Sequence, residues 1–293
     1  MAQPSEPAGS IYDLGYRRYD GVRLGRRHAV ETLYLQGLRA AFGLGRRATS
    51  KIIPIGLCGL ALVPAAVQLG IAAVSSRNDI EIVRPEEYYN FIQLVLALFV
   101  AAVAPELVGR DQRTRTLSLY FSRALLRQDY ALAKLFALTT AMALLTAVPL
   151  VVLFTGDTLV ASSAWGHLKD NWQDIPRILV SGIFVSFVYA SLALAIAAQT
   201  PRRSYATGGI IALFVITAAV GNVVAQTAGA FGILISIFDA THGATLWFFG
   251  GQPDAADPLS HIADFGLICT LALAAVSVAA IALLFQRFRK VAA

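Results

Sequence analysis

The chain has 293 residues, of which 57% are hydrophobic and only 14% are charged. Its apolar residues lie in blocks longer than the helices of a soluble core, which excludes an ordinary soluble domain. The formal net charge is +6, but the Lys and Arg residues form short clusters between apolar runs, which excludes nucleic acid as the expected partner. The predicted fold class is an all-α integral membrane protein.

Residues 1–51 are predicted to be cytoplasmic, with a basic arm followed by an amphipathic helix over residues 28–47. One face of this helix is apolar and carries Val30, Leu33, Tyr34, Leu38, Ala41 and Leu44. The other face is polar and basic, and carries His28, Thr32, Gln36, Arg39 and Arg46. A basic amphipathic helix just before a span is typical of the headgroup plane of a membrane. A lipid-facing anchor and a contact with a partner protein remain alternative roles for it.

Six stretches are long enough to cross the hydrocarbon core, which takes about 20 mostly apolar residues. The predicted spans cover residues 52–75, 89–108, 131–156, 178–199, 206–227 and 265–286. Together they define a six-span transmembrane domain over residues 52–293.

A seventh apolar stretch, Phe231–Phe249, is interrupted by the polar sequence Asp239–Gly243. Each apolar half is too short to cross a membrane, so a re-entrant segment between spans five and six is predicted. Asp239 and His242 are expected to cap two half-helices at this break.

The distribution of charge sets the orientation. With six spans, one side of the membrane holds every Lys and Arg except Arg77, Arg84, Lys169 and Arg177. The positive-inside rule then places both termini in the cytoplasm. Heavy use of Ala, Leu, Gly and Arg suggests a bacterial source, so the expected location is the bacterial inner membrane.

The loop over residues 109–130 contains a short apolar-rich segment, Thr116–Ser122, on the predicted cytoplasmic side. Its large side chains are Leu117, Leu119, Tyr120 and Phe121, and the arginines around it are Arg113, Arg115, Arg123 and Arg127. An apolar cluster that faces water inside a rim of charge indicates a docking surface. A second interfacial helix resting on lipid is the alternative.

This loop resembles that of ABC-2 type permeases, in which an acidic residue precedes a Gly-Thr-Leu-like step and a short coupling helix. A Ser-Arg-Pro-like turn follows, and then a Tyr and a Lys open the third span. The matching positions here are Asp111, Thr116, Leu117, Ser122, Arg123, Tyr130 and Lys134. The sequence departs from the family at Arg115, where Gly is usual, and at Ala124, where Pro is common. The layout of residues 28–293 is also similar to that family.

The resemblance implies a permease subunit that forms the translocation path of an ABC exporter as a dimer, with a second copy or a homologous permease. It implies that a cytosolic ATPase subunit docks on Arg113, Thr116, Leu117, Tyr120 and Arg123. The sequence contains no G-x-x-x-x-G-K-[ST] phosphate-binding loop, so ATP and Mg²⁺ are expected to bind to that partner and no cofactor to this chain. Expected contacts are therefore the ATPase, the second permease and membrane lipids.

Ionisable residues within the predicted spans lie near the span ends, which argues against an ion-coupled transporter. Glu106 is expected to pair with Arg110 one helical turn later, and Lys134 and Arg177 are expected to snorkel toward water. Among the uncharged polar residues, Gln93, Asn222 and Gln226 are candidates for a substrate path. Hydrogen bonds that join neighbouring helices are the alternative role for Asn222 and Gln226.

No residue pattern predicts an enzyme active site or a metal site, since the four histidines match no known ligand spacing. Span interiors with few polar groups favour an amphiphilic or lipid-like cargo. A non-transporting scaffold or sensor that docks a cytosolic partner through residues 109–130 is the alternative from another class. A passive channel, which needs no ATPase, is a third possibility.

Overall fold

The computed structural model describes residues 21, 24–45, 48–74, 85, 87–114, 116–122, 125–161, 163–255 and 257–290. In these ranges the regular secondary structure is entirely helical, and six helices are long and apolar enough to cross a membrane. The predicted six-span, all-α class is thus confirmed.

The six long helices are α2 (Thr49–Val74), α3 (Tyr88–Ala104), α6 (Arg127–Val160), α8 (Asp174–Ala197), α9 (Arg203–Thr227) and α11 (Phe265–Lys290). The shorter ones are α1 (Gly25–Ala41), α4 (Arg110–Arg113), α5 (Leu117–Phe121), α7 (Ala164–Asp170) and α10 (Ile237–Phe249). A π-helix, η1 (Pro105–Gly109), joins α3 to α4, and two 3₁₀ helices are η2 (Ala230–Ile235) and η3 (Pro258–His261). Several spans extend past the predicted apolar stretch, because helical hydrogen bonds continue into the polar boundary.

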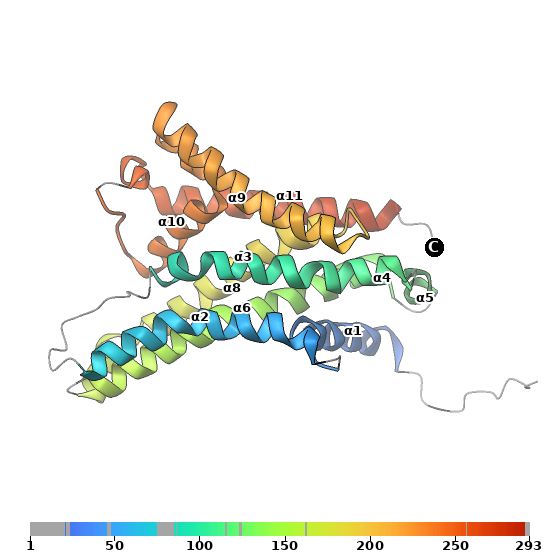
Figure 1. Ribbon diagram of the computed structural model, residues 1–293, viewed down its shortest axis with the longest axis horizontal. Coiled ribbons are helices and arrows are strands. Elements are labelled where there is room, and N and C mark those ends of the chain that lie inside the picture. Colours follow the sequence, from blue (N-terminus) through green and yellow to red (C-terminus); the bar gives the residue numbers. More distant parts are fainter. Residues whose placement is uncertain are drawn as a thin grey trace, which may run out of the picture.

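The long helices alternate in direction, so α2, α6 and α9 begin at the end of the bundle where α4, α8 and α11 finish (Figure 1). We call this end the basic end. Its described basic side chains include Arg110, Arg113, Arg127, Arg202, Arg203, Arg287, Arg289 and Lys290. The helix α10 lies toward the opposite end (Figure 1).

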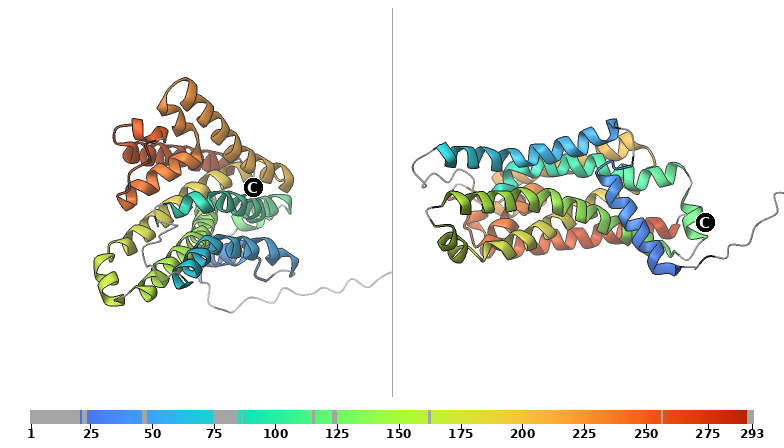
Figure 2. Two further views of the ribbon diagram at one scale, coloured as in Figure 1. Left: turned by 60° about the vertical axis from the view of Figure 1, so that its left-hand side comes forward. Right: turned by 90° about the horizontal axis from the view of Figure 1, so that it is seen from below.

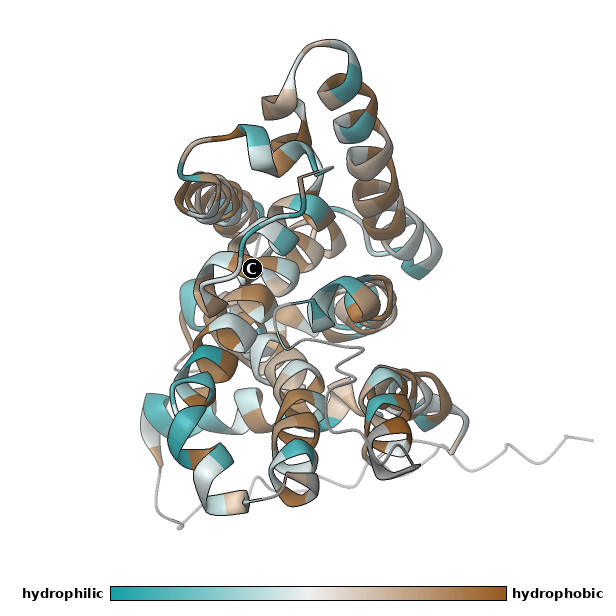
Figure 3. Cartoon of the chain, turned by 90° about the vertical axis from the view of Figure 1, so that its left-hand side faces the viewer, coloured by the Kyte–Doolittle hydropathy of each residue, from teal (hydrophilic) through white to brown (hydrophobic). Residues whose placement is uncertain are grey.

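Burial separates central spans from peripheral ones. In the most apolar window of α8, 72% of the residues are buried, against 17% in that of α9. The core of the bundle is therefore built on α3, α6 and α8, whereas α9 diverges from it (Figure 1). Apolar residues predominate along the helices and polar ones gather at turns and helix ends (Figure 3), as expected for spans that face lipid.

The helix α1 crosses the spans obliquely at the basic end and packs on α6 (Figure 2). Gly37 allows this close approach, because a Cβ atom there would lie 2.8 Å from that of Ala137. The Tyr34 hydroxyl hydrogen-bonds to Thr140 at 3.0 Å. Most of the predicted apolar face is thus turned to the protein, whereas Leu44 lies beyond the helix and is exposed.

An ion pair fixes the start of α1 to the start of α6. The Arg26 guanidinium donates from Nε and Nη2 to the two carboxylate oxygens of Asp129, each at 2.7 Å. Paired hydrogen bonds of this kind fix orientation as well as distance. The position of α1 is therefore set by α6 as well as by its amphipathic pattern.

The segment between α9 and α11 differs from its predicted form. Asp239 and His242 lie inside the continuous helix α10, so the prediction that they cap two half-helices is wrong. The chain breaks instead at Ser236, whose side chain accepts a hydrogen bond from the Asp239 N–H at 3.2 Å. Ser is a favoured N-cap residue, because its hydroxyl satisfies an otherwise unpaired donor in the first turn.

The π-helix η1 interrupts the span formed by α3 and α4. Pro105 has no N–H, so the carbonyl of Ala101, four residues earlier, loses its usual helical donor. The Thr207 hydroxyl of α9 donates to that carbonyl at 3.0 Å. The carbonyl that the irregular turn leaves without a helical donor therefore receives a hydrogen bond from the neighbouring span.

Candidate functional site

The predicted docking loop is built around Asp111 of α4. Its Oδ2 atom lies 2.9 Å from the Lys134 ammonium and accepts a hydrogen bond from the Tyr130 hydroxyl at 2.8 Å. Its backbone carbonyl accepts hydrogen bonds from the N–H and the hydroxyl of Thr116, at 3.1 and 3.2 Å. We call these four residues the Asp111 cluster. They were matched to the family motif from the sequence, and the structure brings them together.

Lys134 does not snorkel toward water, so that prediction is wrong. Only 6% of the residue is exposed, and its ammonium turns to Asp111. A buried charge is costly unless an opposite charge and hydrogen bonds compensate it. The cluster supplies both, which explains how a lysine is accommodated inside the first turns of α6.

Aromatic rings join α5 to the rest of the basic end. The Tyr130 ring centroid lies 5.9 Å from that of Tyr120, 6.1 Å from that of Phe121 and 5.1 Å from that of Phe288. Burial raises the pKa of Tyr120, and the nearby Asp111 carboxylate raises it further. The short helix α5 thus rests on Tyr130 of α6, whose ring also packs on Phe288 in the last turn of α11.

The two faces of α5 have different surroundings. Leu117 is only 5% exposed, so the expectation that it faces water is wrong. Tyr120 and Phe121 are half-buried against Tyr130. Leu119 is 66% exposed and is the large apolar side chain that α5 presents to solvent. We call Ser118, Leu119 and Ser122 the exposed face of α5.

The remaining predicted docking residues lie beside this helix. Arg113 is exposed at the end of α4, and Thr116 is half-buried at the N-cap of α5. Arg123, with the departures Arg115 and Ala124, lies outside the described residues. The docking role of all these residues stays a prediction.

Two side chains tie the end of α8 to this region. The Ala198 carbonyl accepts hydrogen bonds from Gln112 Nε2 and from Arg287 Nε, each at 3.0 Å. The Arg127 guanidinium donates to the Arg289 carbonyl at 2.8 Å. These links were not predicted from the sequence. The apolar Phe288 among the charged residues of the tail was a signal that this segment is anchored, and its ring packs on that of Tyr130.

Glu106 pairs with a different arginine from the predicted one. Its carboxylate lies 2.7 Å from the Arg203 guanidinium of α9, and within the described residues no ion pair joins it to Arg110. The π-helix alters the spacing of side chains along the span, so the i,i+4 expectation fails there. The prediction of a Glu106–Arg110 pair is therefore wrong.

The hydrogen bonds of the described residues do not join the three candidate substrate-path residues to one another, and their place on a substrate path stays a prediction. Gln93 donates to Asn90 at 2.9 Å. Asn222 donates to the Ala218 carbonyl at 2.9 Å and to the Asp239 carboxylate at 3.3 Å, and Gln226 is exposed. Asn222 thus links α9 to α10, which agrees with a role in joining helices.

One histidine and one acidic side chain near α10 lie close together, but they do not form a metal site. His242 Nε2 lies 3.9 Å from Asp257 Oδ2. Among the residues that the structure describes, no group of three His, Cys, Asp or Glu side chains has an arrangement suited to a metal ion.

Comparison with known proteins identifies a family for this chain. The family model described as ABC-2 family transporter protein matches residues 27–289. No curated protein matches the chain. The family match includes α1, all six spans and the Asp111 cluster.

Proposed function

The chain belongs to the ABC-2 family of transporter proteins, and from this premise we propose that it is the permease subunit of an ABC exporter in a bacterial inner membrane. The family and the six apolar helices make it a multi-pass membrane protein. The positive-inside rule supports a cytoplasmic position for the basic end and for both termini.

The partner in this proposal is a cytosolic ATPase subunit that holds ATP and Mg²⁺. The observation that carries it is the two-faced helix α5, which is anchored through Leu117 and exposes Leu119. An exposed apolar side chain at the basic end, where Arg113 is also exposed, fits a protein interface with an apolar centre and a charged rim. The ATPase docks on the exposed face of α5, with Arg113 and Arg123 at the rim.

The Asp111 cluster supplies a route for coupling. Movement of α5 acts on α4 through Thr116 and Asp111, and on α6 through Asp111 and Lys134. The aromatic contact between Tyr130 and Phe288 extends this connection to α11. Closure of the ATPase pair is thereby transmitted to the spans, and a dimer of permeases switches the path between the two sides of the membrane.

The proposed cargo is amphiphilic or lipid-like, because the spans contain few polar groups in their interior. The segment η2–α10 is proposed to be re-entrant, since α10 has only 13 residues and a span takes about 20. Its buried face and the Asn222–Asp239 hydrogen bond support this proposal, since they hold α10 against the other helices.

The test of docking is affinity purification of the tagged chain, expressed with its neighbouring genes, followed by identification of any co-purifying nucleotide-binding subunit by mass spectrometry. Leu119→Asp is expected to abolish association, because it places a carboxylate at the apolar centre of the interface. The matched control is Leu24→Asp, which changes a 63% exposed leucine at the N-cap of α1. Normal association of a monodisperse Leu119→Asp variant would contradict the docking surface.

A second measurement separates an exporter from a scaffold. The reconstituted complex of permease and ATPase is expected to hydrolyse ATP faster when lipid or cargo is present. A stable complex whose hydrolysis responds to neither supports the scaffold instead. A monodisperse chain that co-purifies with no nucleotide-binding subunit contradicts the exporter and leaves the scaffold and the passive channel as the alternatives.

A further inference from the structure

The short helix α7 follows α6 at the end of the bundle opposite the basic end, which we call the outer end. Two contacts hold α7 against α6. His167 Nδ1 hydrogen-bonds to the Thr158 hydroxyl at 3.1 Å, and the His167 ring centroid lies 6.0 Å from that of Phe154. The Ser163 hydroxyl caps the helix by accepting a hydrogen bond from the Gly166 N–H at 3.2 Å. The connection from α6 to α8 therefore contains a capped helix that is attached to its neighbour.

Large apolar side chains before, within and after α7 are exposed. Leu159 in the last turn of α6 is 81% exposed, Trp165 of α7 is 76% exposed and Trp172 is 59% exposed. Apolar surface left in water costs about 25 cal/mol per Å² relative to its burial. An indole ring also has one polar edge, where its N–H donates a hydrogen bond. A partner suited to these side chains offers apolar contacts and hydrogen-bond acceptors together.

The exposed faces of two spans lead to α7. On α6, exposed side chains recur at helical spacing from the middle of the span to its outer end, at Leu144, Val148, Val151, Thr155 and Leu159. On α8, Ile175, Leu179 and Ile183 are exposed at intervals of one turn, and this series begins just after Trp172. Such faces of spanning helices contact acyl chains. Their continuity with the side chains around α7 favours lipid over another protein as the partner.

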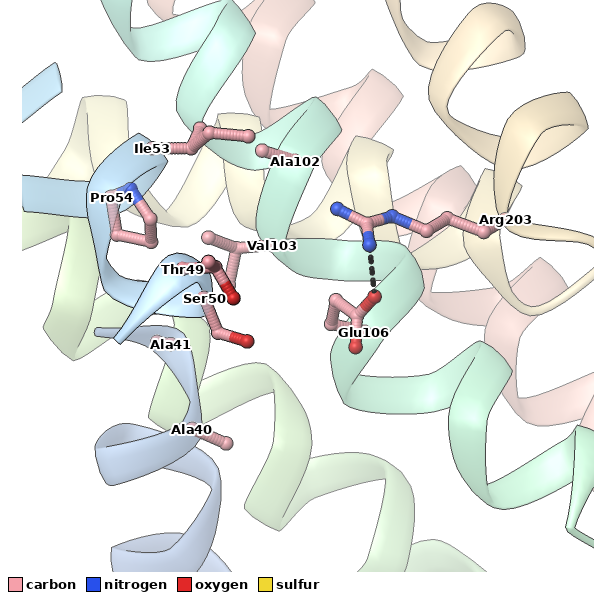
Figure 4. Close-up of a pocket in the computed structure, with 10 residues that line it drawn as sticks. All are labelled: Ala40, Ala41, Thr49, Ser50, Ile53, Pro54, Ala102, Val103, Glu106 and Arg203. Carbon is pink, nitrogen blue, oxygen red and sulfur yellow. Dashed lines mark ion pairs between the residues drawn. The ribbon is translucent and has the colours of Figure 1, made fainter. Parts of the chain in front are cut away.

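The length of α6 brings α7 to the boundary of the membrane. The helix has 34 residues and is therefore about 51 Å long, which is enough to cross a bilayer of about 40–45 Å including its headgroups. At the basic end, charged groups mark the polar boundary, as in the Glu106–Arg203 ion pair, whose side chains line a pocket with the start of α2 (Figure 4). With that end in one headgroup region, the end of α6 reaches the other.

We propose that α7 is an interfacial helix that binds phospholipids of the leaflet at the outer end through Trp165 and Trp172. The two indole rings lie between the headgroups and the acyl chains, where their N–H groups donate to phosphate or ester oxygens. Leu159 contacts the acyl chains. Trp is enriched at this level of membrane proteins, because its ring is apolar with one polar edge. This inference requires only the membrane position of the chain, and it holds whether or not the ATPase docks on α5.

The experiment measures tryptophan fluorescence of the full chain in vesicles of phosphatidylethanolamine and phosphatidylglycerol. The chain has three tryptophans, so Trp172→Phe with Trp247→Phe leaves Trp165 as the emitter. The vesicles also contain phosphatidylcholine with a nitroxide quencher, placed either on the headgroup or near the end of an acyl chain. The headgroup quencher is expected to reduce the emission of Trp165 more than the acyl-chain quencher does. The same order is expected for Trp172 in the chain with Trp165→Phe and Trp247→Phe.

The matched control places a tryptophan in the middle of the same span. Leu144→Trp, in a chain whose own tryptophans are replaced by Phe, changes a 46% exposed side chain on the face of α6 that leads to Leu159. This position lies about 22 Å from Leu159 along the helix, so the acyl-chain quencher is expected to be the stronger one there. The same order of quenching at Trp165 and in Leu144→Trp overturns the proposed depth of α7.

Iodide, a quencher dissolved in water, distinguishes lipid from the other surroundings that α7 could have. Trp165 is expected to be quenched less by iodide than N-acetyltryptophanamide added to the same vesicles, because headgroups cover the ring. Equal quenching by iodide, without an effect of either lipid quencher, would mean that the ring lies in water. Protection from all three quenchers would mean that protein covers it, such as a second copy of the chain. Either of these outcomes overturns the assignment to lipid.

Discussion

The Lys134 ammonium lies 2.9 Å from Asp111 Oδ2, and this contact joins the first turns of α6 to the end of the preceding span. Both side chains are largely buried, with exposed fractions of 8% and 14%. The Tyr130 hydroxyl donates to the same carboxylate oxygen at 2.8 Å. The buried ion pair, together with the Tyr130 hydroxyl that donates to it, thus joins the two ends of the loop between these helices. This contact fixes the orientation of α5 on the bundle.

Removal of the lysine charge is expected to destabilise the protein strongly. Lys134→Met leaves the Asp111 carboxylate buried without its cation, and the loss of one partner of a buried pair costs about 3–5 kcal/mol. Thermal unfolding in detergent measures it, with Arg113→Met as the control, since Arg113 is exposed and the change there should lie within about 0.5 kcal/mol. The variant Asp111→Asn with Lys134→Met should recover part of the loss, and a double variant less stable than Lys134→Met would contradict this account.

Substitution of two helical glycines by alanine is expected to have opposite effects on stability, because Gly37 lies where α1 approaches α6 closely and Gly208 of α9 has open space around it. Gly37→Ala places a methyl group 2.8 Å from the Ala137 Cβ atom, and overpacking of this kind costs about 1–3 kcal/mol. Gly208→Ala in α9 meets no atom within 4 Å and is expected to stabilise the helix by about 0.5–1 kcal/mol. Unfolding midpoints measure both effects, and hydrogen exchange of α1 measures the local effect of Gly37→Ala. Equal shifts at the two positions would be evidence against the α1–α6 packing.

The hydroxyl that supports the π-helix gives a third prediction. Thr207→Val removes the donor to the Ala101 carbonyl and is expected to destabilise the protein by about 1–3 kcal/mol, because that carbonyl also lacks a donor from Pro105. Thr217→Val is the matched control in the same helix, where the hydroxyl bonds only to carbonyls of its own helix. Thermal unfolding compares the two, and a larger loss in the control contradicts the role given to Thr207.

The surroundings of Tyr120 predict a loss of stability at high pH. Burial, followed by the charge of Asp111, raises the pKa of this phenol above its ordinary value of 10.0. As pH rises, Tyr120 therefore loses its proton in the unfolded chain before it does so in the folded protein. The contribution of Tyr120 to the free energy of unfolding is fully present below the ordinary pKa, and it is lost as pH rises through the pKa of the folded state. Unfolding midpoints at about pH 8 and about pH 11 should differ less in Tyr120→Phe than in the original chain. An identical pH dependence in the two proteins would refute the assignment.

Two of the incorrect predictions have the same physical origin. The pairing of Glu106 with Arg110 and the snorkelling of Lys134 were inferred from neighbours along one helix. The true partners, Arg203 and Asp111, lie on other helices or across a loop. Local spacing cannot identify such partners, because a long charged side chain reaches whichever opposite charge the packing brings near.

The break before α10 shows a related limit. Polar residues at Asp239–Gly243 suggested an interruption, yet a helix tolerates polar side chains wherever neighbouring helices or water satisfy them. The chain turns at Ser236, where Gly221 and Gly232 let η2 approach α9 closely, since a Cβ atom at Gly221 would lie 2.8 Å from Ser236. Only the packing of η2 on α9 reveals why the turn is there.

The sequence by itself determined the number of spans, the side that carries the positive charge and the family motif from Asp111 to Lys134. These follow from the length of apolar runs, from the cost of moving charge across a membrane and from the spacing of residues along the chain. All three can be read from the order of the residues, without knowledge of how the helices pack. Tertiary structure decided that Leu117 is buried while Leu119 is exposed, and that Glu106 and Arg203 share a pocket with the start of α2. Those outcomes depend on which helix faces lie against each other, and the packing of the whole bundle sets them.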